Sequence, residues 1–328
     1  MKIPKVTVLM PVFNGEEFLR EAVASILEQT FSDFEYLVID DASTDRSREI
    51  LESYSDPRLR LLVNPTRLGL TKSLNEGLQI ARGVYLARMD ADDISRPTRL
   101  KIQNDFLDRN PEVGLLGSSW EHLNPAGQVQ GFNPAFNGKP AVHFMCHGSI
   151  MIRKTCLLVV GPYREIFEYA QDYDLYLRIS EKFGVANIPE PLYRLRLHPG
   201  SVSRRNRPRQ DLYASLALKL AKERKQKGRN ILDGLGPAEA ARFRDQFLST
   251  SGWSRDRLLS YNQSALAQAA LDLGEARRAG GYIFKALRLY PFNLEAWNVR
   301  ARLVFAKIRG GKFSPPVATP KDPFPPRE

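Results

Sequence analysis

The sequence of 328 residues contains only two cysteines, Cys146 and Cys156, and no long apolar run. Two cysteines cannot build a disulfide framework, so we expect a reducing compartment and predict that the protein is cytoplasmic. The longest apolar run, CLLVV, ends at Gly161 and Pro162 and is far shorter than the roughly 20 residues that span a bilayer. The N-terminal segment enters strand-like sequence at once, which argues against a signal peptide.

Glycine-rich phosphate loops are also missing. The sequence contains no GxxxxGK[ST], and no GxGxxG follows the first predicted strand. An EF-hand calcium loop starting at Asp90 is excluded, because it would place Ser95 and Lys101 where glycine and glutamate are required. A diphosphate bound by this chain would therefore need a metal on Asp90 and Asp92 to neutralise its charge.

The positive charge is concentrated in the C-terminal part of the chain. Residues 1–200 carry 23 Lys and Arg against 26 Asp and Glu, whereas residues 201–328 carry 25 against 11. A solvated helical face is the simpler interpretation of this basic part, and attraction to an anionic surface is the alternative. Residues 208–230 predict a basic amphipathic helix that could contact the inner face of the cell membrane peripherally. No nucleic-acid partner is predicted.

Strand-like and helix-like segments alternate over the first 120 residues. Strands are predicted at 5–12, 34–40, 59–64, 84–90 and 113–119, and helices at 16–30, 41–54, 71–82 and 97–110. Two more strands, at 147–153 and 192–197, surround a helix at 170–184. This alternation with short connections favours an open, mostly parallel α/β sheet flanked by helices.

The rest of the chain predicts helices at 208–230 and 237–250, and two or three more between 260 and 308. A tetratricopeptide-like (TPR-like) register and an ordinary helical hairpin explain the last stretch equally well. The residues that fit the repeat register are Ala279, Ile283, Ala286 and Pro291, with Trp297 opening the next unit.

We predict four regions along the chain. They are an α/β domain at 1–205, a basic helical linker region at 206–252, a helical TPR-like extension at 253–310, and a proline-rich disordered tail at 311–328. The extension could bind a protein partner.

Polar side chains follow three predicted strands at the point where each strand ends. These are residues 11–14, then Asp40 and Asp41, then Asp90 and Asp92. Ligands of open α/β sheets bind beyond the carboxyl ends of the strands, so we expect the three strand ends to share one edge. Two carboxylates spaced i, i+2 suit a hard divalent ion such as Mg²⁺ or Mn²⁺ together with substrate phosphate oxygens. Taken alone, the Asp90 cluster could instead be a solvated turn that caps the following helix.

The histidines and cysteines give a weaker signal. His143, Cys146 and His147 lie close together in HFMCHGSIMIRK, but no pattern there supports the four ligands of a structural zinc site. Alternating strand residues are the simpler interpretation.

Three stretches resemble the family 2 glycosyltransferases with a GT-A fold. They are VTVLMPVFNGEEFLREAVASILEQTFSDFEYLVIDDASTDRS, NPTRLGLTKSLNEGLQIARGVYLARMDADD and QDYDLYLRI, and the similarity covers about residues 4–205. The resemblance implies a Rossmann-like, mostly parallel sheet, here with an all-α C-terminal extension. It also implies a nucleotide-diphospho-sugar donor, a divalent metal (Mn²⁺ or Mg²⁺) and inversion of the anomeric centre. The implied acceptor is a hydroxyl of a glycan or lipid-linked saccharide in cell-surface polysaccharide synthesis.

The resemblance also implies a role for each matched residue. Asp90 and Asp92 match the DxD motif, which bridges metal and diphosphate, and Asp172 matches the general base of the ED motif. Gln171 departs from the family pattern, in which an acidic residue is common. The residues implied for nucleotide-sugar binding are Pro11, Val12, Asn14, Asp40, Asp41, Arg67, Lys72, Asp90, Ala91 and Asp92. His198 is implied in metal or phosphate contact, assisted by Arg204 and Arg205, and His147 and Gln171 are implied on the acceptor side.

Other interpretations stay open. Without the resemblance, Asp172 and Asp174 would simply favour the positive end of the helix that they begin. A sugar nucleotidyltransferase also pairs an α/β sheet with an acidic metal site, although it would be expected to carry a glycine-rich basic loop after the first strand. A non-catalytic helical-repeat adaptor with an inactive GT-A domain is the alternative that is not an enzyme.

Overall fold

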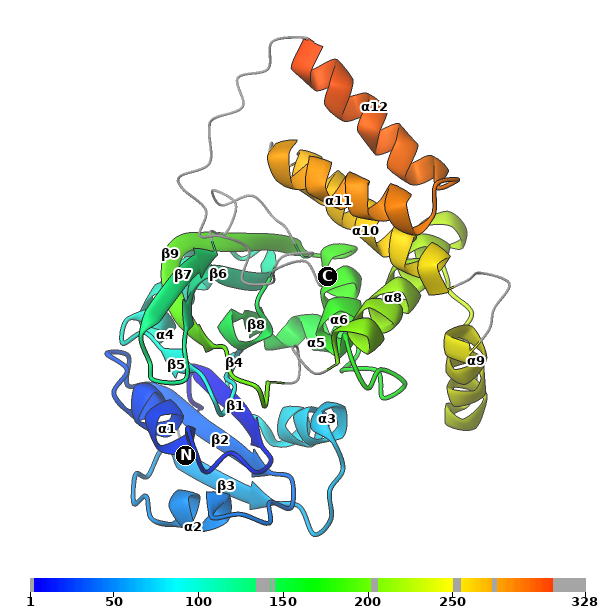
Figure 1. Ribbon diagram of the computed structural model, residues 1–328. Helices are drawn as coiled ribbons and strands as arrows, with labels where there is room; N and C mark the ends of the chain where they lie inside the picture. Colours follow the sequence, from blue (N-terminus) through cyan, green and yellow to red (C-terminus); the bar gives the residue numbers. More distant parts are fainter. Residues whose placement is uncertain are drawn as a thin grey trace. The chain divides into compact units, whose positions relative to one another are not determined.

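The computed structural model describes residues 3–133, 142, 145–201, 206–249, 255–272 and 276–308. The chain divides into two compact units, one up to Pro199 and a second over Gly200–Thr319 (Figure 1). His143, Arg204 and Arg205 lie outside the described residues, as does the predicted tail. The finer domain limits stay predictions.

The described part of the first unit contains a nine-stranded sheet. Its strands are β1 (Val6–Val12), β2 (Phe34–Asp40), β3 (Leu59–Val63), β4 (Tyr85–Arg88), β5 (Ile94–Ser95), β6 (Val113–Leu123), β7 (Val129–Asn133), β8 (Met151–Arg153) and β9 (Gly184–Arg196). Their order is β3-β2-β1-β4-β8-β6-β9-β5, and β7 pairs with β6. The first four strands pair in parallel, as do β6 and β9, whereas β5, β7 and β8 pair antiparallel.

Helices cover both faces of this sheet. They are α1 (Leu19–Leu27), α2 (Ser47–Glu52), α3 (Leu70–Ile80), α4 (Arg99–Arg109), α5 (Lys154–Val160) and α6 (Gln171–Ser180). Side chains alternate along β1, so Val8 and Met10 join one buried cluster with α1, whereas Leu9 joins the opposite cluster with α3 and α6. Because both faces are buried, the central strands have nearly continuous apolar sequences.

Two predicted elements begin four or more residues later than expected. The helix predicted at 41–54 begins at Ser47, because the residues before it form a loop held by side chains of neighbouring segments. The strand predicted at 147–153 begins at Met151, and the 3₁₀ turn η3 (His147–Ser149) precedes it. Gly148 lies directly against the Tyr193 ring, where a Cβ would fall 2.1 Å from the hydroxyl oxygen, so close packing fixes this turn.

The second unit is helical in its described part. It contains α8 (Arg207–Lys227), α9 (Pro237–Ser249), α10 (Arg255–Asp272), α11 (Ala276–Leu289) and α12 (Leu294–Ile308). Ile283, Val299 and Leu303 pack with Ala267 in a small core between α10, α11 and α12. Among the described helices, none combines the length and the apolar character that crossing a bilayer requires.

A buried carboxylate joins the first strands at the end away from the acidic turn. Glu35 of β2 is 2% exposed. Its Oε1 accepts hydrogen bonds from the Thr7 hydroxyl at 2.6 Å and the Arg82 backbone N–H at 2.6 Å. Its Oε2 pairs with Arg60 at 2.7 Å and with the Arg82 guanidinium at 2.6 Å. Burial by itself raises the pKa of Glu35, but these hydrogen bonds together bring that pKa below its ordinary value.

Replacing Glu35 should therefore destabilise the sheet. We expect Glu35→Gln to lower the free energy of unfolding by about 2 kcal/mol at neutral pH, less than for a fully buried ion pair because both arginines are partly solvated. The pKa of Glu35 is lower in the folded state, so its contribution is present above the unfolded pKa and is lost as the pH falls. Urea unfolding of the full chain between pH 3 and 7 measures both effects. The matched control is Glu52→Gln in an exposed pair with Arg48, which should change little.

Candidate active site

The three aspartates that follow β4 have different surroundings. Asp93 is 3% exposed, and its carboxylate accepts hydrogen bonds from the Tyr193 hydroxyl at 2.8 Å and the Arg196 backbone N–H at 2.7 Å. The Tyr193 oxygen also accepts a hydrogen bond from the Asp90 backbone N–H at 3.1 Å. Burial, followed by the charges of Asp92 and Asp90, raises the pKa of Asp93 well above its ordinary value. Asp93 thus fastens the acidic turn to β9.

Asp92 reaches outward from this fixed turn. Its Oδ2 lies 2.9 Å from Nε2 of His198, the second residue after β9. The His198 ring packs edge-on against Phe18, with ring centroids 4.9 Å apart. The backbone oxygen of Asp92 accepts a hydrogen bond from Arg196 Nε at 3.0 Å. The structure therefore brings together Asp92 and His198, two residues that the sequence singled out 106 positions apart.

Asp90 pairs with a buried guanidinium. Arg88 of β4 is 3% exposed, and its Nη2 lies 2.7 Å from Asp90 Oδ1. Arg88 Nε and Nη1 are buried and have no hydrogen-bond partner in the part of the chain that the structure describes. Burial raises the pKa of Asp90, the Arg88 charge lowers it in part, and Asp92 raises it further. These two donors of Arg88, which have no partner among the described residues, are suited to an oxygen atom of a ligand.

Asp172 lies in the first turn of α6. Burial raises the pKa of Asp172, and hydrogen bonds from the Tyr173 N–H and from its own N–H lower it in part. The positive charge of Arg88 also lowers this pKa, whereas the negative charge of Asp90 raises it. The preceding Gln171 is 5% exposed. Ala170 has a left-handed backbone, with φ of 53°. A non-glycine residue in this conformation costs about 1 kcal/mol, and such strain is common at functional sites.

The loop before α6 is held by α3. Asn75 exchanges two hydrogen bonds with the backbone of Tyr163, and Thr71 donates one to the backbone oxygen of Phe167 at 2.7 Å. The Tyr163 hydroxyl lies 3.0 Å from His147 Nε2. Burial and the Arg88 charge hold the pKa of His147 well below its ordinary value, so its ring is neutral at physiological pH. His147 therefore offers a hydrogen bond without charge.

The structure distinguishes Asp40 from Asp41, which the sequence does not. Asp41 accepts hydrogen bonds from the N–H groups of Leu68 and Gly69, both at 2.8 Å, and from the Asn64 amide at 3.0 Å. Asp40 Oδ1 accepts a hydrogen bond from the Ser43 N–H at 3.0 Å, whereas its Oδ2 is buried and meets no partner among the described residues. Asp41 therefore fixes the loop that carries Arg67, whereas Asp40 keeps one oxygen free.

The other predicted nucleotide-binding residues occupy varied positions. Pro11 and Val12 are buried in β1, and Val12 lies beside Asp40 in the parallel register, so these strand ends share one edge as expected. The Asn14 amide oxygen accepts the Thr44 N–H at 2.8 Å. Ala91 is partly buried beside the first apolar cluster.

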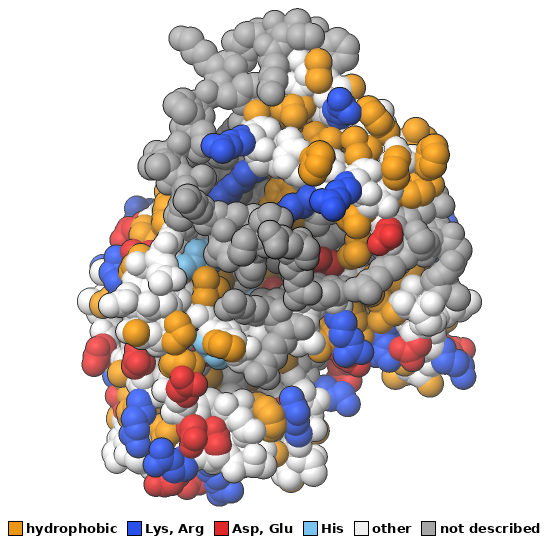
Figure 2. Space-filling model, in the orientation of Figure 1, with side chains coloured by type: hydrophobic (Ala, Val, Ile, Leu, Met, Phe, Trp, Pro, Cys, Tyr) orange, Lys and Arg blue, Asp and Glu red, His pale blue; other side chains and the backbone are white. Residues whose placement is uncertain are grey.

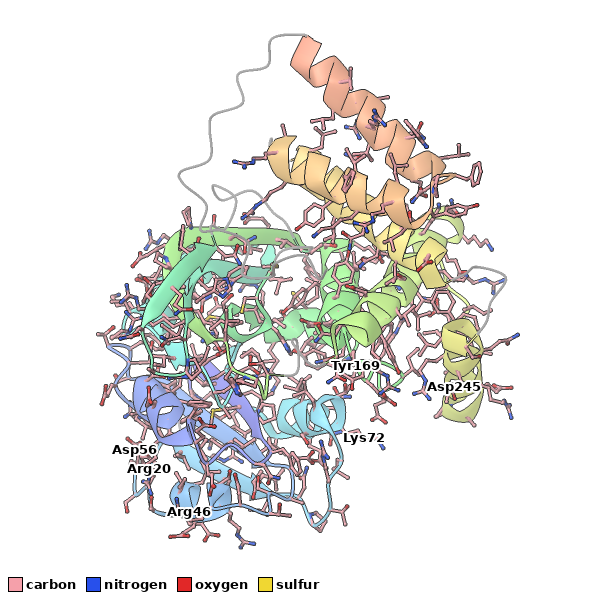
Figure 3. The ribbon with its side chains drawn as sticks, viewed as in Figure 1. Arg20, Arg46, Asp56, Lys72, Tyr169 and Asp245 are labelled. Atoms are coloured by element: carbon pink, nitrogen blue, oxygen red, sulfur yellow. The ribbon has the colours of Figure 1, made fainter. Side chains whose placement is uncertain are left out.

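Two predicted cations sit on the surface. The Arg67 guanidinium stacks on the Phe13 ring, 3.8 Å from its centroid. Lys72 is exposed and points away from the sheet on α3 (Figure 3). Stacking restrains Arg67 beside the strand ends, whereas Lys72 extends into solvent.

Sequence reasoning missed the residues that organise this site from within. Arg88, Arg99, Tyr193 and Arg196 are all less than 4% exposed. Arg99 Nη2 donates to the backbone oxygen of Arg88 at 2.7 Å, and burial lowers the pKa of Arg99 to about 10. Charged residues are seldom buried without partners, so the position of Arg88 and Arg196 in strand sequence was the available signal.

Known proteins resemble this chain in sequence. The model of glycosyl transferase family 2 matches residues 7–157. EpsE of Bacillus subtilis (strain 168) is 34% identical over 216 residues, which cover 62% of this chain and 77% of EpsE. The chain therefore belongs to glycosyl transferase family 2, and glycosyl transfer is the class of reaction that this membership indicates.

Solved structures resemble the fold. S. aureus TarS 1–349, in a crystal structure with UDP-GlcNAc, aligns with a TM-score of 0.57 and 18% identity over 93% of this chain and 92% of that chain. The mannosyltransferase PcManGT from Pyrobaculum calidifontis, solved in complex with GDP-Man and Mn²⁺, aligns with a TM-score of 0.53 and 20% identity over 94% and 87% of the two chains. The predicted GT-A-like α/β fold is confirmed.

The environments of Asp92 and Asp93 predict that the two mutations lower thermal stability by different amounts. Asp93→Ala removes a buried acceptor from two donors, so we expect Tm to fall by about 5 °C or more. Asp92→Ala should change Tm by less than about 2 °C, because its side chain is 36% exposed and binds one imidazole. Differential scanning calorimetry of the two variants measures the contrast. Equal losses of Tm would show that Asp93 is not the residue that fastens the turn.

Proposed function

We propose that the protein is an inverting glycosyltransferase of the cytoplasm. It transfers a sugar from a nucleotide-diphospho-sugar to a hydroxyl of a glycan or lipid-linked saccharide, in cell-surface polysaccharide synthesis. One observation carries the proposal: the buried Arg88 pairs with Asp90 of the acidic turn at 2.7 Å, and its charge partly offsets the burial that raises the pKa of Asp172 of α6. A diphosphate site and a candidate base around one cation suit a direct displacement.

Asp172 is the proposed general base. A sugar hydroxyl is a weak nucleophile until a carboxylate accepts its proton during attack. Burial raises the pKa of Asp172, which makes its carboxylate a stronger base than that of an ordinary aspartate. Gln171 and the neutral His147 are the proposed acceptor contacts, since both offer hydrogen bonds without charge.

The donor is proposed to lie along the shared edge of β1, β2 and β4. The free Asp40 oxygen can accept a hydrogen bond from the base or ribose of the nucleotide. Arg67, held on the Phe13 ring and on a loop anchored by Asp41, would border the nucleotide. TarS and PcManGT, which share this fold, were solved with nucleotide sugars, and this supports the proposed class of donor.

The residues of the acidic turn fit a divalent ion shared with substrate. The described residues contain no group of three His, Cys, Asp or Glu that could hold a metal by themselves. Asp92 and His198 provide two neighbouring donors, and Asp90 lies two residues away but is paired with Arg88. Mg²⁺ and Mn²⁺ commonly take one or two carboxylates and complete their shell with water and phosphate oxygens. Such an ion, when bound, would neutralise charge on the leaving diphosphate.

Donor hydrolysis tests the proposal directly. We expect slow release of nucleoside diphosphate from one member of a panel of UDP-, GDP- and dTDP-sugars, dependent on Mn²⁺ or Mg²⁺ and abolished by EDTA and by Asp92→Ala. Calorimetric titration with each donor covers the case in which hydrolysis is too slow to detect. A chain that neither releases nor binds any donor in the presence of metal would favour the inactive-adaptor alternative. Consumption of a nucleoside triphosphate with a sugar phosphate would favour a nucleotidyltransferase.

The base assignment predicts a particular dependence on pH. Asp172→Asn should lower kcat by about 10²-fold or more while donor affinity stays within a few fold. In the unaltered protein, kcat/KM should rise with pH through the raised pKa of Asp172, because the ionised form accepts the proton. Arg88→Met should move this acid limb to higher pH, since the guanidinium charge lowers that pKa. An Asp172→Asn enzyme with normal kcat would exclude the assignment.

A further inference from the structure

The second unit carries an open apolar groove between α11 and α12. Its volume is about 580 Å³. The lining residues follow one face of each helix: Gly280, Ile283, Phe284, Leu287 and Arg288 on α11, and Arg300, Leu303 and Val304 on α12. These spacings of three and four residues are those by which one helix packs against others. This residue pattern is typical of a surface against which a further helix, in addition to α10, packs.

The groove is exposed where it would meet a partner. Phe284 is 67% exposed and Val304 is 47% exposed, whereas Ile283 and Leu303 beneath them are buried. On the face drawn in Figure 2, hydrophobic side chains gather over the region of α11 and α12, with Lys and Arg among them. Exposed apolar side chains that line a groove and are bordered by charge are typical of interaction sites.

Two adjacent glycines on α11 would allow the backbone of a partner to approach this helix closely. Gly280 and Gly281 lie in the interior of α11, where each costs roughly 0.5–1 kcal/mol relative to alanine. A Cβ at Gly280 would have its nearest neighbour, Leu303 Cδ2, at 3.9 Å, and a Cβ at Gly281 would meet nothing within 4 Å. Packing against the described residues therefore does not require glycine at either position. A backbone of another helix that passes close to α11 would require glycine there, because a Cβ would block the approach.

The charge around the groove selects an acidic partner. Helices α11 and α12 carry seven Lys and Arg but one acidic residue, Glu295, whose carboxylate binds Lys222 Nζ at 2.8 Å. Arg288 and Arg300 belong to the groove lining itself. The Arg300 guanidinium lies 4.8 Å from the centroid of the Trp297 ring, which keeps it beside the groove. Cations that border an apolar groove favour acidic partners over basic ones.

We propose that this groove docks an amphipathic helix of another protein. The helix presents apolar side chains at i, i+3, i+4 and i+7 to Phe284, Leu287 and Val304, and acidic side chains to Arg288 and Arg300. The next part of this chain's own sequence does not suit the role, because residues 313–328 contain six prolines. An anionic bilayer shares the charge preference, but a concave groove between two helices fits a cylinder better than a flat surface. The proposal does not depend on the donor or acceptor of the first unit.

A pair of synthetic peptides tests it on the full chain. One is a 20-residue helix with leucine at i, i+3, i+4 and i+7 and glutamate on its flanks, and the other has lysine in place of glutamate. We expect fluorescence anisotropy to show the acidic peptide binding about tenfold or more tightly, with affinity falling as salt rises. Phe284→Glu should weaken binding about tenfold or more, and the pair Arg288→Glu and Arg300→Glu should reverse the peptide preference. The exposed Phe292→Ala, outside the groove lining, is the matched control and should change nothing.

Several outcomes would overturn the proposal. Equal affinity for the two peptides, or an acidic peptide that binds Phe284→Glu normally, would exclude this groove as the site. Binding to phosphatidylglycerol vesicles that Phe284→Glu abolishes, without peptide binding, would assign the face to a membrane. Dimerisation in sedimentation that Phe284→Glu abolishes would assign it to a second copy of the chain. Tighter peptide binding after removal of residues 311–328 would assign it to the chain's own tail. Circular dichroism of each variant checks that the helices remain folded.

Discussion

The organisation of the acidic turn depends on the buried carboxylate of Asp93. It joins a turn that follows β4 to Tyr193 and Arg196 of β9, about a hundred residues later in the sequence. Because Asp93 takes both donors, its neighbours Asp90 and Asp92 need not stabilise the turn and keep carboxylate oxygens for other partners. The same attachment places His198, two residues beyond β9, against Asp92. One buried aspartate thus fixes the turn that carries the two carboxylates of the proposed diphosphate site.

Arg88 is the second element of this arrangement. Burying the Arg88 guanidinium, which is 3% exposed, would cost free energy if no negative charge lay nearby. Asp90 Oδ1 supplies that charge 2.7 Å from Arg88 Nη2. Burial raises the pKa of Asp172, and the Arg88 charge offsets this in part; burial also lowers the pKa of His147, and the Arg88 charge lowers it further. Within the described residues two of the Arg88 nitrogens have no hydrogen-bond partner, which leaves this cation incompletely satisfied. Such groups are common where a ligand completes a site. The proposed base and the proposed diphosphate site are therefore electrostatically linked.

The second unit follows different constraints. The positive charges of α8 do not form one unpaired face of the helix. Lys219 pairs with Glu223, and Lys222 pairs with Glu295. Tyr213, on the same helix, is buried. These pairings offset part of the charge that suggested a membrane-bound helix, and peripheral membrane contact stays a prediction. The groove on α11 and α12 combines exposed apolar side chains with cations, which makes it the stronger candidate for an interaction.

The sequence by itself determined the alternation of strands and helices, the mostly parallel direction of the strands and the carboxylates at the strand ends. Apolar periodicity and strand-end chemistry are local properties, so they can be read along the chain. Tertiary structure decided which carboxylates are free. Asp40 and Asp41 are adjacent residues of the same type, so the sequence cannot distinguish them. In the fold, the segment 64–69 donates hydrogen bonds to Asp41, and this contact distinguishes the two. The roles of Arg88 and Tyr193 likewise depend on contacts between distant strands, because burial and pairing in space are not encoded in any short stretch of sequence.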